Sequence, residues 1–214
     1  AGCVFTDQGG DCGLTNLPYQ QTFTCNDKAV QYWLLDKPAA GPAWAVDDTP
    51  GTPAAQSAPC SLNFNDGKTF QCAAGQGSLD GSARSPLFDA TGLVGKPLVA
   101  KFSVAGTWDA APFAQLDFEA SLDGKAWTTL KTIGAQDTWS TFTVSLTAYA
   151  GKKFRTRFHF AAPACNVLQA GSGPFVDDFV VTSPACANNA NCDDKNPCTT
   201  DTCNTRSEEH TSEL

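Results

Sequence analysis

The sequence predicts an all-β domain of the jelly-roll or β-sandwich type, with small disulfide-rich modules at both ends. Two observations predict the sandwich: short runs alternate apolar and polar residues, and Gly, Pro and Asp turn signals separate these runs. No window shows a sustained helical period. A third observation predicts the modules, because six of the ten cysteines fall before residue 13 or after residue 185.

These patterns divide the chain into four parts. The predicted parts are a partial cysteine-rich repeat, a jelly-roll β-sandwich, a second partial repeat, and a polar tail that we exclude from the fold; they cover residues 1–13, 14–184, 185–205 and 206–214.

The first predicted strands lie around Asp66-Gly67, a turn signal between residues 62–64 and residues 69–70. Residues 97–104 form the next strand, and their alternation places four side chains on one face: Leu98, Ala100, Phe102 and Val104.

Residues 114–122 alternate in the same way, with Leu116, Phe118 and Ala120 inward. Asp123-Gly124 then predicts a two-residue hairpin turn into a strand that carries Trp127 and Leu130. Three more strands follow in order, at residues 141–146, 154–160 and 174–181.

Composition limits the partners. The net charge is −8 and no basic patch is present, which argues against nucleic acid as a ligand. No apolar run is long enough to cross a membrane. With two histidines and no Cys-x₂-Cys pair, the ten cysteines indicate disulfides in an oxidising, extracellular setting rather than zinc sites. We expect a monomeric module of a longer chain.

The order of several short motifs resembles MAM-like jelly rolls of secreted proteins, including the accessory β domains of immune-inhibitor-A-type metallopeptidases. The motifs span residues 17–182 and include Leu17-Pro-Tyr-Gln-Gln-Thr-Phe23, Ser61-Leu-Asn-Phe64, Gly81-Ser-Ala-Arg-Ser-Pro86 and Gly173-Pro-Phe-Val-Asp-Asp178. The ends are similar to CTDC-type cysteine-rich repeats, through Gly2-Cys-Val-Phe-Thr6 and Asp193-Asp-Lys-Asn-Pro-Cys-Thr-Thr-Asp-Thr-Cys203. Residues 206–214 resemble the translation of a sequencing-adapter read-through.

Two disulfides are expected within the large domain. Cys60 and Cys72 flank the Asp66-Gly67 turn almost symmetrically, so a hairpin there would bring them together. The resemblance implies a bond between Cys25 and Cys165, because the strands beside them are neighbours in such jelly rolls. Cys3 is expected to pair with Cys12 or with a cysteine that precedes this sequence, and the last four cysteines among themselves: Cys186, Cys192, Cys198 and Cys203.

The resemblance also implies a structural role for Asp177-Asp178, whose side chains should point to opposite faces of the last strand. In MAM-like domains the corresponding acid holds a structural cation or caps backbone amides of the first strand. Calcium suits such oxygen ligands, and the site would lie against Thr24 and Asp27. This chain carries Phe23-Thr24 where those domains often have Phe-Glu, so a plain hydrogen-bonded cap stays open as the alternative.

Other polar and aromatic residues give weaker signals. Trp108 reads as an exposed loop residue and is the candidate contact for a ligand, whereas Trp33, Trp44 and Trp139 are expected in the core or at its edge. His159 is expected on the solvated outer face of its strand. No nucleophile–base pair, G-x-S-x-G elbow or H-E-x-x-H motif is present, so we expect no enzyme activity.

Two functional hypotheses follow. The first is a non-enzymatic binding, adhesion or spacer module of a secreted or cell-surface protein, with a glycan or protein ligand. The alternative is a carbohydrate-binding accessory domain of a secreted hydrolase whose catalytic domain lies outside this sequence. A shared fold does not distinguish them.

Overall fold

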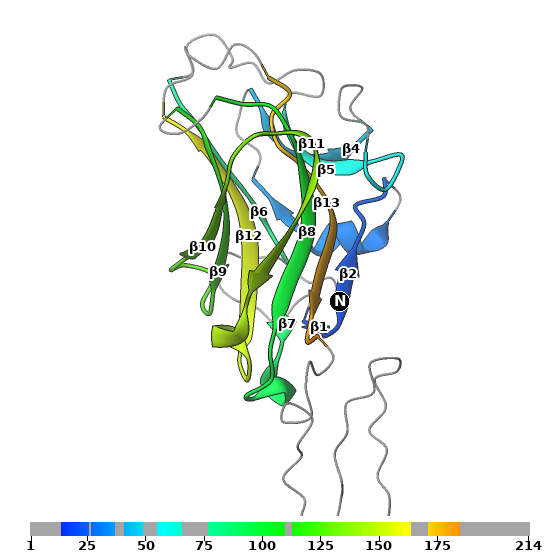
Figure 1. The fold of residues 1–214 in the computed structure, drawn as a ribbon, viewed down its shortest axis with the longest axis vertical. Helices are drawn as coiled ribbons and strands as arrows, with labels where there is room; N and C mark the ends of the chain where they lie inside the picture. The colour runs from blue at the N-terminus through cyan, green and yellow to red at the C-terminus, as the bar shows by residue number, and fades with distance from the viewer. Residues whose placement is uncertain are drawn as a thin grey trace, which may run out of the picture.

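The computed structural model describes residues 14–25, 27–36, 41–48, 55–65, 77–109, 113–163 and 171–184. These residues form two β-sheets that pack face to face, which confirms the predicted all-β sandwich (Figure 1). Both predicted cysteine-rich modules, the polar tail and the Asp66-Gly67 turn lie outside the described residues.

The first sheet has seven strands, and its long strand β12 pairs with β9, β6 and β7. β10 extends the sheet beyond β9, β3 pairs with β6, and β1 pairs with β7. The strands are β1 (Thr15–Asn16), β3 (Leu34–Leu35), β6 (Leu79–Arg84), β7 (Phe88–Asp89), β9 (Gln115–Ser121), β10 (Thr128–Ile133) and β12 (Lys153–Ala162).

The second sheet has six strands, and β13 lies in its middle. β13 pairs with β8 along one edge and with β2 and β5 along the other. β11 pairs with β8, and β4 pairs with β5. The strands are β2 (Tyr19–Gln21), β4 (Ala43–Asp47), β5 (Ser61–Asn65), β8 (Val99–Gly106), β11 (Gln136–Ser145) and β13 (Phe175–Thr182).

Three 3₁₀ turns connect strands: η1 (Lys28–Tyr32), η2 (Thr91–Leu93) and η3 (Thr147–Tyr149). Within the described ranges, no helix has the length and apolar character needed to span a membrane.

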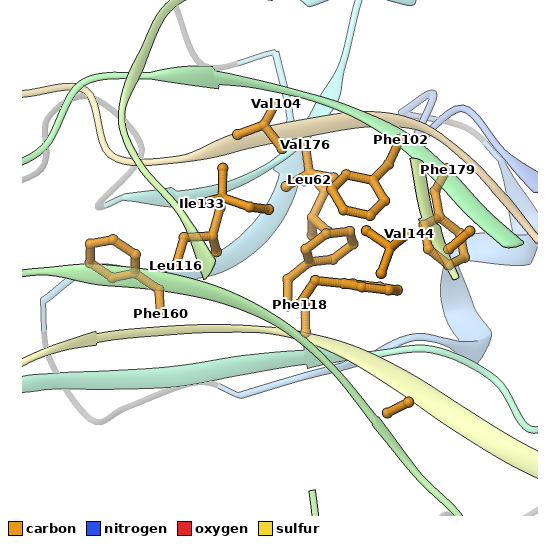
Figure 2. Close-up of a cluster of buried hydrophobic side chains, with 14 of the residues drawn as sticks. Leu62, Phe102, Val104, Leu116, Phe118, Ile133, Val144, Phe160, Val176 and Phe179 are labelled. Atoms are coloured by element: carbon orange, nitrogen blue, oxygen red, sulfur yellow. The ribbon is translucent and has the colours of Figure 1, made fainter. Parts of the chain in front are cut away.

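Phenylalanine rings fill the space between the sheets (Figure 2). Phe102 on β8 lies 4.8 Å from Phe118 on β9 and 5.0 Å from Phe158 on β12, measured between ring centroids. Phe179 on β13 closes the group at 5.9 Å from Phe158. All four side chains are fully buried. Burial of each such ring contributes about 1.5–3 kcal/mol, and offset or edge-to-face ring pairs add to this.

The predicted inward faces are confirmed. The alternating residues of the strands at 97–104, 114–122 and 154–160 have no solvent exposure: Leu98, Ala100, Phe102, Val104, Leu116, Phe118, Ala120, Phe154, Phe158 and Phe160. Alternation predicts these positions well because each strand buries one face against the opposite sheet.

The connection between β9 and β10 differs from the predicted two-residue turn. Six residues, 122–127, separate the two strands. The Asp123 carboxylate accepts hydrogen bonds from the backbone N–H groups of Lys125 and Ala126, at 2.8 and 2.9 Å. These bonds lower the pKa of Asp123. The local hydrogen bonds of Asp123 stabilise a wider loop, and Trp127 lies at its end.

The disulfide prediction for the large domain is wrong, because Cys25 bonds to Cys60. The predicted bonds of Cys25 to Cys165 and of Cys60 to Cys72 are therefore excluded, and Cys72 and Cys165 lie outside the described residues. The reason is topological. β2 and β5 both pair with β13, at Phe179–Val181 and at Phe175–Val176. Cys25, a few residues after β2, therefore lies beside Cys60, directly before β5, with Cα atoms 5.3 Å apart.

We predict that peptide mapping under non-reducing conditions recovers one peptide pair joined through Cys25 and Cys60. Replacing both cysteines by serine should lower the free energy of unfolding by about 4 kcal/mol, the chain-entropy value for a separation of 35 residues. The wild-type chain measured without reductant is the control. A recovered Cys60–Cys72 peptide would contradict the structure.

Candidate binding face

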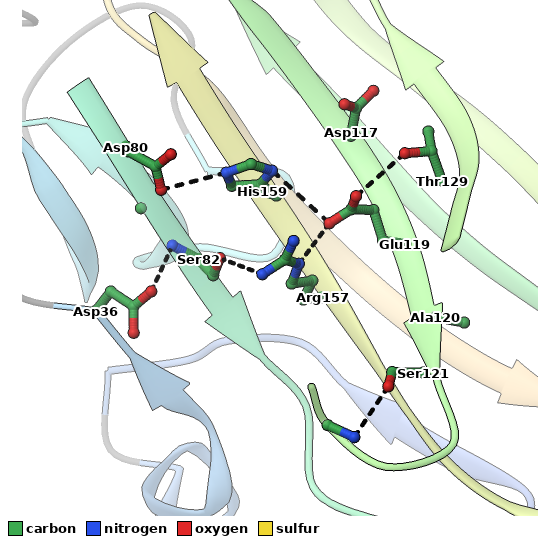
Figure 3. A network of polar contacts seen from close by, with 12 residues as sticks. Asp36, Asp80, Ser82, Asp117, Glu119, Ala120, Ser121, Thr129, Arg157 and His159 are labelled. Atoms are coloured by element: carbon green, nitrogen blue, oxygen red, sulfur yellow. Dashed lines mark hydrogen bonds and ion pairs between the residues drawn. The ribbon is translucent and has the colours of Figure 1, made fainter. Parts of the chain in front are cut away.

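A continuous group of polar side chains covers the outer surface of the first sheet, on β6, β12, β9 and β10 (Figure 3). We call this group the polar face. Figure 3 labels nine of its residues: Asp36, Asp80, Ser82, Asp117, Glu119, Ser121, Thr129, Arg157 and His159. Strand alternation and side-chain contacts add Arg84, Gln115, Thr132 and Arg155, with Trp127 at the margin.

The polar face follows from strand alternation and register. The inward residues of β12 are fully buried, so Arg155, Arg157 and His159 point outward. Arg157 lies opposite Glu119 on β9 and opposite Arg84 on β6. His159 lies opposite Asp117 and Ser82. Directly opposite side chains on neighbouring strands are within contact distance.

Glu119 is the centre of the hydrogen-bond network. Its side chain is only 8% exposed, although it lies on an outer face. One carboxylate oxygen accepts from Arg157 Nε, and the other accepts from Thr129 Oγ1 at 3.1 Å. His159 Nδ1 lies 3.7 Å from the oxygen that faces Arg157. This covered, charge-assisted pair is held more rigidly than a solvated surface pair.

Arg157 links the network to an aromatic ring. Its Nη1 donates to Ser82 Oγ at 3.3 Å. Its guanidinium carbon lies 4.5 Å from the centroid of the Trp127 ring, which is within the range of a cation–π contact.

His159 lies on the outer face of β12, as expected, but its side chain is held by partners rather than freely solvated. It is 21% exposed, and its Nε2 lies 3.3 Å from Asp80 Oδ1. This arrangement could not be predicted from the sequence. Asp80 and Glu119 lie 79 and 40 positions from His159 along the chain, and strand pairing brings them together.

The remaining acids of the polar face also have partners. Asp117 accepts from Thr132 Oγ1 and from Gln115 Nε2, both at 2.6 Å. Asp36 pairs with Arg84 at 2.7 Å and accepts from the backbone N–H of Ser82 at 3.0 Å.

Arg155 is different from the other basic side chains of this face. Its Nη1 donates to the backbone carbonyl of Ser85 at 3.0 Å, and no carboxylate of the described residues pairs with it. The side chain is half-buried. Burial, and then the positive charge of Arg84, lower the pKa of Arg155.

Asp117, Glu119 and His159 bring three ligand atoms within 4.8 Å of one another. A metal ion there would compete with Arg157, which already places a positive charge on Glu119. Both oxygens of Asp117 are also engaged by neutral donors. We therefore describe this trio as part of a hydrogen-bond network.

Asp177 and Asp178 lie together, not on opposite faces as expected. A bulge interrupts the pairing of β13 with β8 at this point, and Asp178 has a φ of 50°. Asp177 is fully buried and accepts from the backbone N–H of Ser57 at 2.7 Å and of Asp178 at 2.8 Å. Asp178 accepts from the Ser57 hydroxyl. Both acids thus hold the segment that precedes Cys60.

The other predicted calcium ligands have local roles. The Asp27 carboxylate accepts from the Ala29 N–H at 2.7 Å and caps η1, and the Thr24 carbonyl accepts from the Asp27 N–H at 3.0 Å. At least one oxygen of each residue expected to bind calcium is thus engaged in a hydrogen bond within the protein. These contacts favour the alternative of a backbone cap, and the calcium site stays a prediction.

Trp108 does not form the exposed contact expected from its loop position. It is 7% exposed and meets Phe160 edge-on, with ring centroids 6.0 Å apart. Trp33 and Trp44 are buried in the core, as expected. The aromatic residue beside the polar face is Trp127, which the sequence indicated only as part of a strand.

No family model and no curated protein matches this sequence. Among solved structures, a carbohydrate-binding module of family CBM61 in complex with β-1,4-galactotriose is 11% identical, with a TM-score of 0.47 over 77% of this chain and 99% of that chain. The CBM22-1 xylan-binding domain from Paenibacillus barcinonensis Xyn10C is 16% identical, with a TM-score of 0.45 over 78% and 95%. The K2 cleaved adhesin domain of Lys-gingipain is 16% identical, with a TM-score of 0.47 over 77% and 98%. Similarity at this level carries no argument about function.

We predict a pH dependence of stability that comes from Asp177. Burial raises the pKa of this carboxyl from 3.8 to about 6. Because the pKa is higher in the folded state than in the unfolded state, protonation of Asp177 stabilises the fold. This contribution to the free energy of unfolding is complete below pH 3.8 and is lost as pH rises through about 6. The loss is expected to be on the order of 1–3 kcal/mol. Denaturant unfolding in chelator across this range should show it, and Asp177→Asn should flatten the profile. The same change at the exposed Asp137 is the control, and an unchanged profile in Asp177→Asn would contradict the assignment.

Calcium binding at Asp177 or Asp178 is tested by melting the chain in calcium and in chelator. An ion that binds only the folded state raises stability by RT ln(1 + [L]/Kd), about 2.7 kcal/mol at a hundredfold excess over Kd. Because both carboxylates contact Ser57, Asp177→Asn and Asp178→Asn should each reduce the calcium effect. Identical melting curves in calcium and chelator would leave the two acids as backbone and hydroxyl acceptors.

Proposed function

We propose that this chain is a non-catalytic, extracellular glycan-binding module and that the polar face is its binding site. The observation that carries the proposal is the network across β6, β12 and β9, in which Glu119 joins Arg157 and His159 beside Trp127. Sugar hydroxyls both donate and accept hydrogen bonds, so they suit a surface that presents carboxylates, a guanidinium and an imidazole side by side.

The network is organised before any ligand binds. Arg157 is 19% exposed and Glu119 is 8% exposed, and each side chain is held by partners on neighbouring strands. Side chains that are already ordered lose little conformational entropy when a ligand binds, which favours affinity for small polar ligands.

A glycan fits this surface better than a protein partner does. Protein interfaces have an apolar core with a polar rim. The exposed large apolar residues among the described segments all lie outside the polar face: Leu14, Tyr32, Val94, Phe113 and Leu122. The alternative hypothesis from the sequence, a carbohydrate-binding domain, is thus favoured over general adhesion.

Asp117 and Glu119 hold the network in place rather than acting in catalysis, whereas Asp80 is 74% exposed and can accept from a ligand. Each oxygen of Asp117 and Glu119 already accepts a hydrogen bond from a side chain of the protein. A general acid or a nucleophile needs a carboxylate that is available to the reacting atoms. The Cys25–Cys60 bond supports an extracellular location, because disulfides persist in oxidising compartments.

We predict that the full chain binds at least one carbohydrate on a glycan array, and that Trp127→Ala and His159→Ala each weaken binding by at least fivefold in calorimetry. Loss of a central contact residue typically costs about 1 kcal/mol or more. Thr143→Ala is the matched control, because Thr143 is exposed on β11 of the other sheet.

Melting temperatures of the variants separate loss of binding from loss of folding. An array without any bound glycan would overturn the proposed function. Full binding by both folded variants would place the site elsewhere on the molecule.

A further inference from the structure

The basic side chains of the polar face have carboxylate partners with one exception among the described residues. Arg84 pairs with Asp36, Arg157 pairs with Glu119, and His159 lies beside Asp80. Arg155 has only the carbonyl of Ser85. The strand register explains this difference. Arg157 lies opposite an acid on β9, Glu119, whereas Arg155 lies opposite Ser121, which carries no charge.

Arg155 is in an electrostatically unfavourable position. It is half-buried, and Arg84 adds positive charge nearby. A partly desolvated cation without a counter-ion is costly, and a like charge beside it adds to the cost. An anionic group placed against Arg155 would relieve both effects. The neighbouring acids do not supply it, because Asp36 and Glu119 are engaged by Arg84 and Arg157.

The guanidinium has an unused edge for such a group. Within the described part of the chain, the guanidinium is hydrogen-bonded through Nη1 to Ser85, so Nε and Nη2 remain for a ligand. Two parallel N–H groups match the two oxygens of a carboxylate.

Arg155 is also within reach of a sugar bound to the rest of the face. It lies two residues from Arg157 on the same face of β12, which is about 6–7 Å along a strand. A saccharide that contacts Arg157 and His159 can therefore present a substituent of the next ring to Arg155.

Resting on the proposed function, we propose that Arg155 is a carboxylate-binding subsite and that the ligand is an acidic saccharide that carries a uronic-acid carboxylate. Selectivity arises from this direct contact and not from long-range attraction, because the chain as a whole carries a net charge of −8. Glu119, opposite the neighbouring Arg157, and Asp36, paired with Arg84, place negative charge near the subsite and disfavour groups with more negative charge than a carboxylate.

The test uses matched pairs of oligosaccharides with the full chain: tetrasaccharides of glucuronate, galacturonate and mannuronate, each beside its carboxyl-reduced, neutral counterpart. We expect at least one acidic form to bind at least tenfold more tightly than its neutral partner in calorimetry. Arg155→Gln should abolish this ratio, because it removes the group that contacts the carboxylate of the acidic form. Lys101→Gln is the control, because it removes the same charge from an exposed position on β8 of the other sheet.

Arg155→Lys keeps the charge and removes the planar fork, so it should retain part of the preference, and it covers the case in which Arg155→Gln folds poorly. Equal binding of acidic and neutral forms by the wild-type chain would overturn the subsite and leave the glycan-binding function intact. A preference that survives Arg155→Gln, or tighter binding of a sulfated tetrasaccharide than of the uronate, would also overturn it. Absence of binding to every saccharide would overturn the subsite together with the proposed function.

Discussion

The alternation of side chains along β12 is the constraint on which the rest of this structure depends. Phe154, Phe158 and Phe160 face the opposite sheet and are fully buried, while Arg155, Arg157 and His159 face outward. A shift of one residue in the pairing of β12 would exchange these two sets. Because exposure of three phenylalanine rings is energetically prohibitive, core packing fixes the register. The same register determines which acid on β9 or β6 each outward cation meets.

Much of the sandwich was predictable, and the reasons are local. Two-residue periodicity located the buried face of β8, β9 and β12 without knowledge of their partners. The polar face was not predictable, because β12 pairs with β9 and β6, which precede it by many residues. From the sequence alone His159 has no predicted partner, whereas in the structure it lies between Asp80 and Glu119.

The wrong predictions for the disulfide and for Asp177 and Asp178 also arise from features that local sequence patterns do not record. The choice of Cys60 as the partner of Cys25 depends on β2 and β5 sharing β13, which is a long-range feature. The expectation that Asp177 and Asp178 face opposite ways assumed regular strand geometry, which the bulge in β13 interrupts. Trp108 was expected to be exposed because it lies in a loop, but a loop side chain can still pack against the core.

The pairing of β2 with β13 has a consequence for how the domain is connected to other segments. Tyr19, near the start of the described chain, lies opposite Val181, near its end. Neighbouring strands are about 5 Å apart, so the chain enters and leaves the sandwich at one end, beside β1, β2 and the end of β13 (Figure 1). In a longer protein, segments that precede β1 and segments that follow β13 would therefore be attached at this same end of the sandwich.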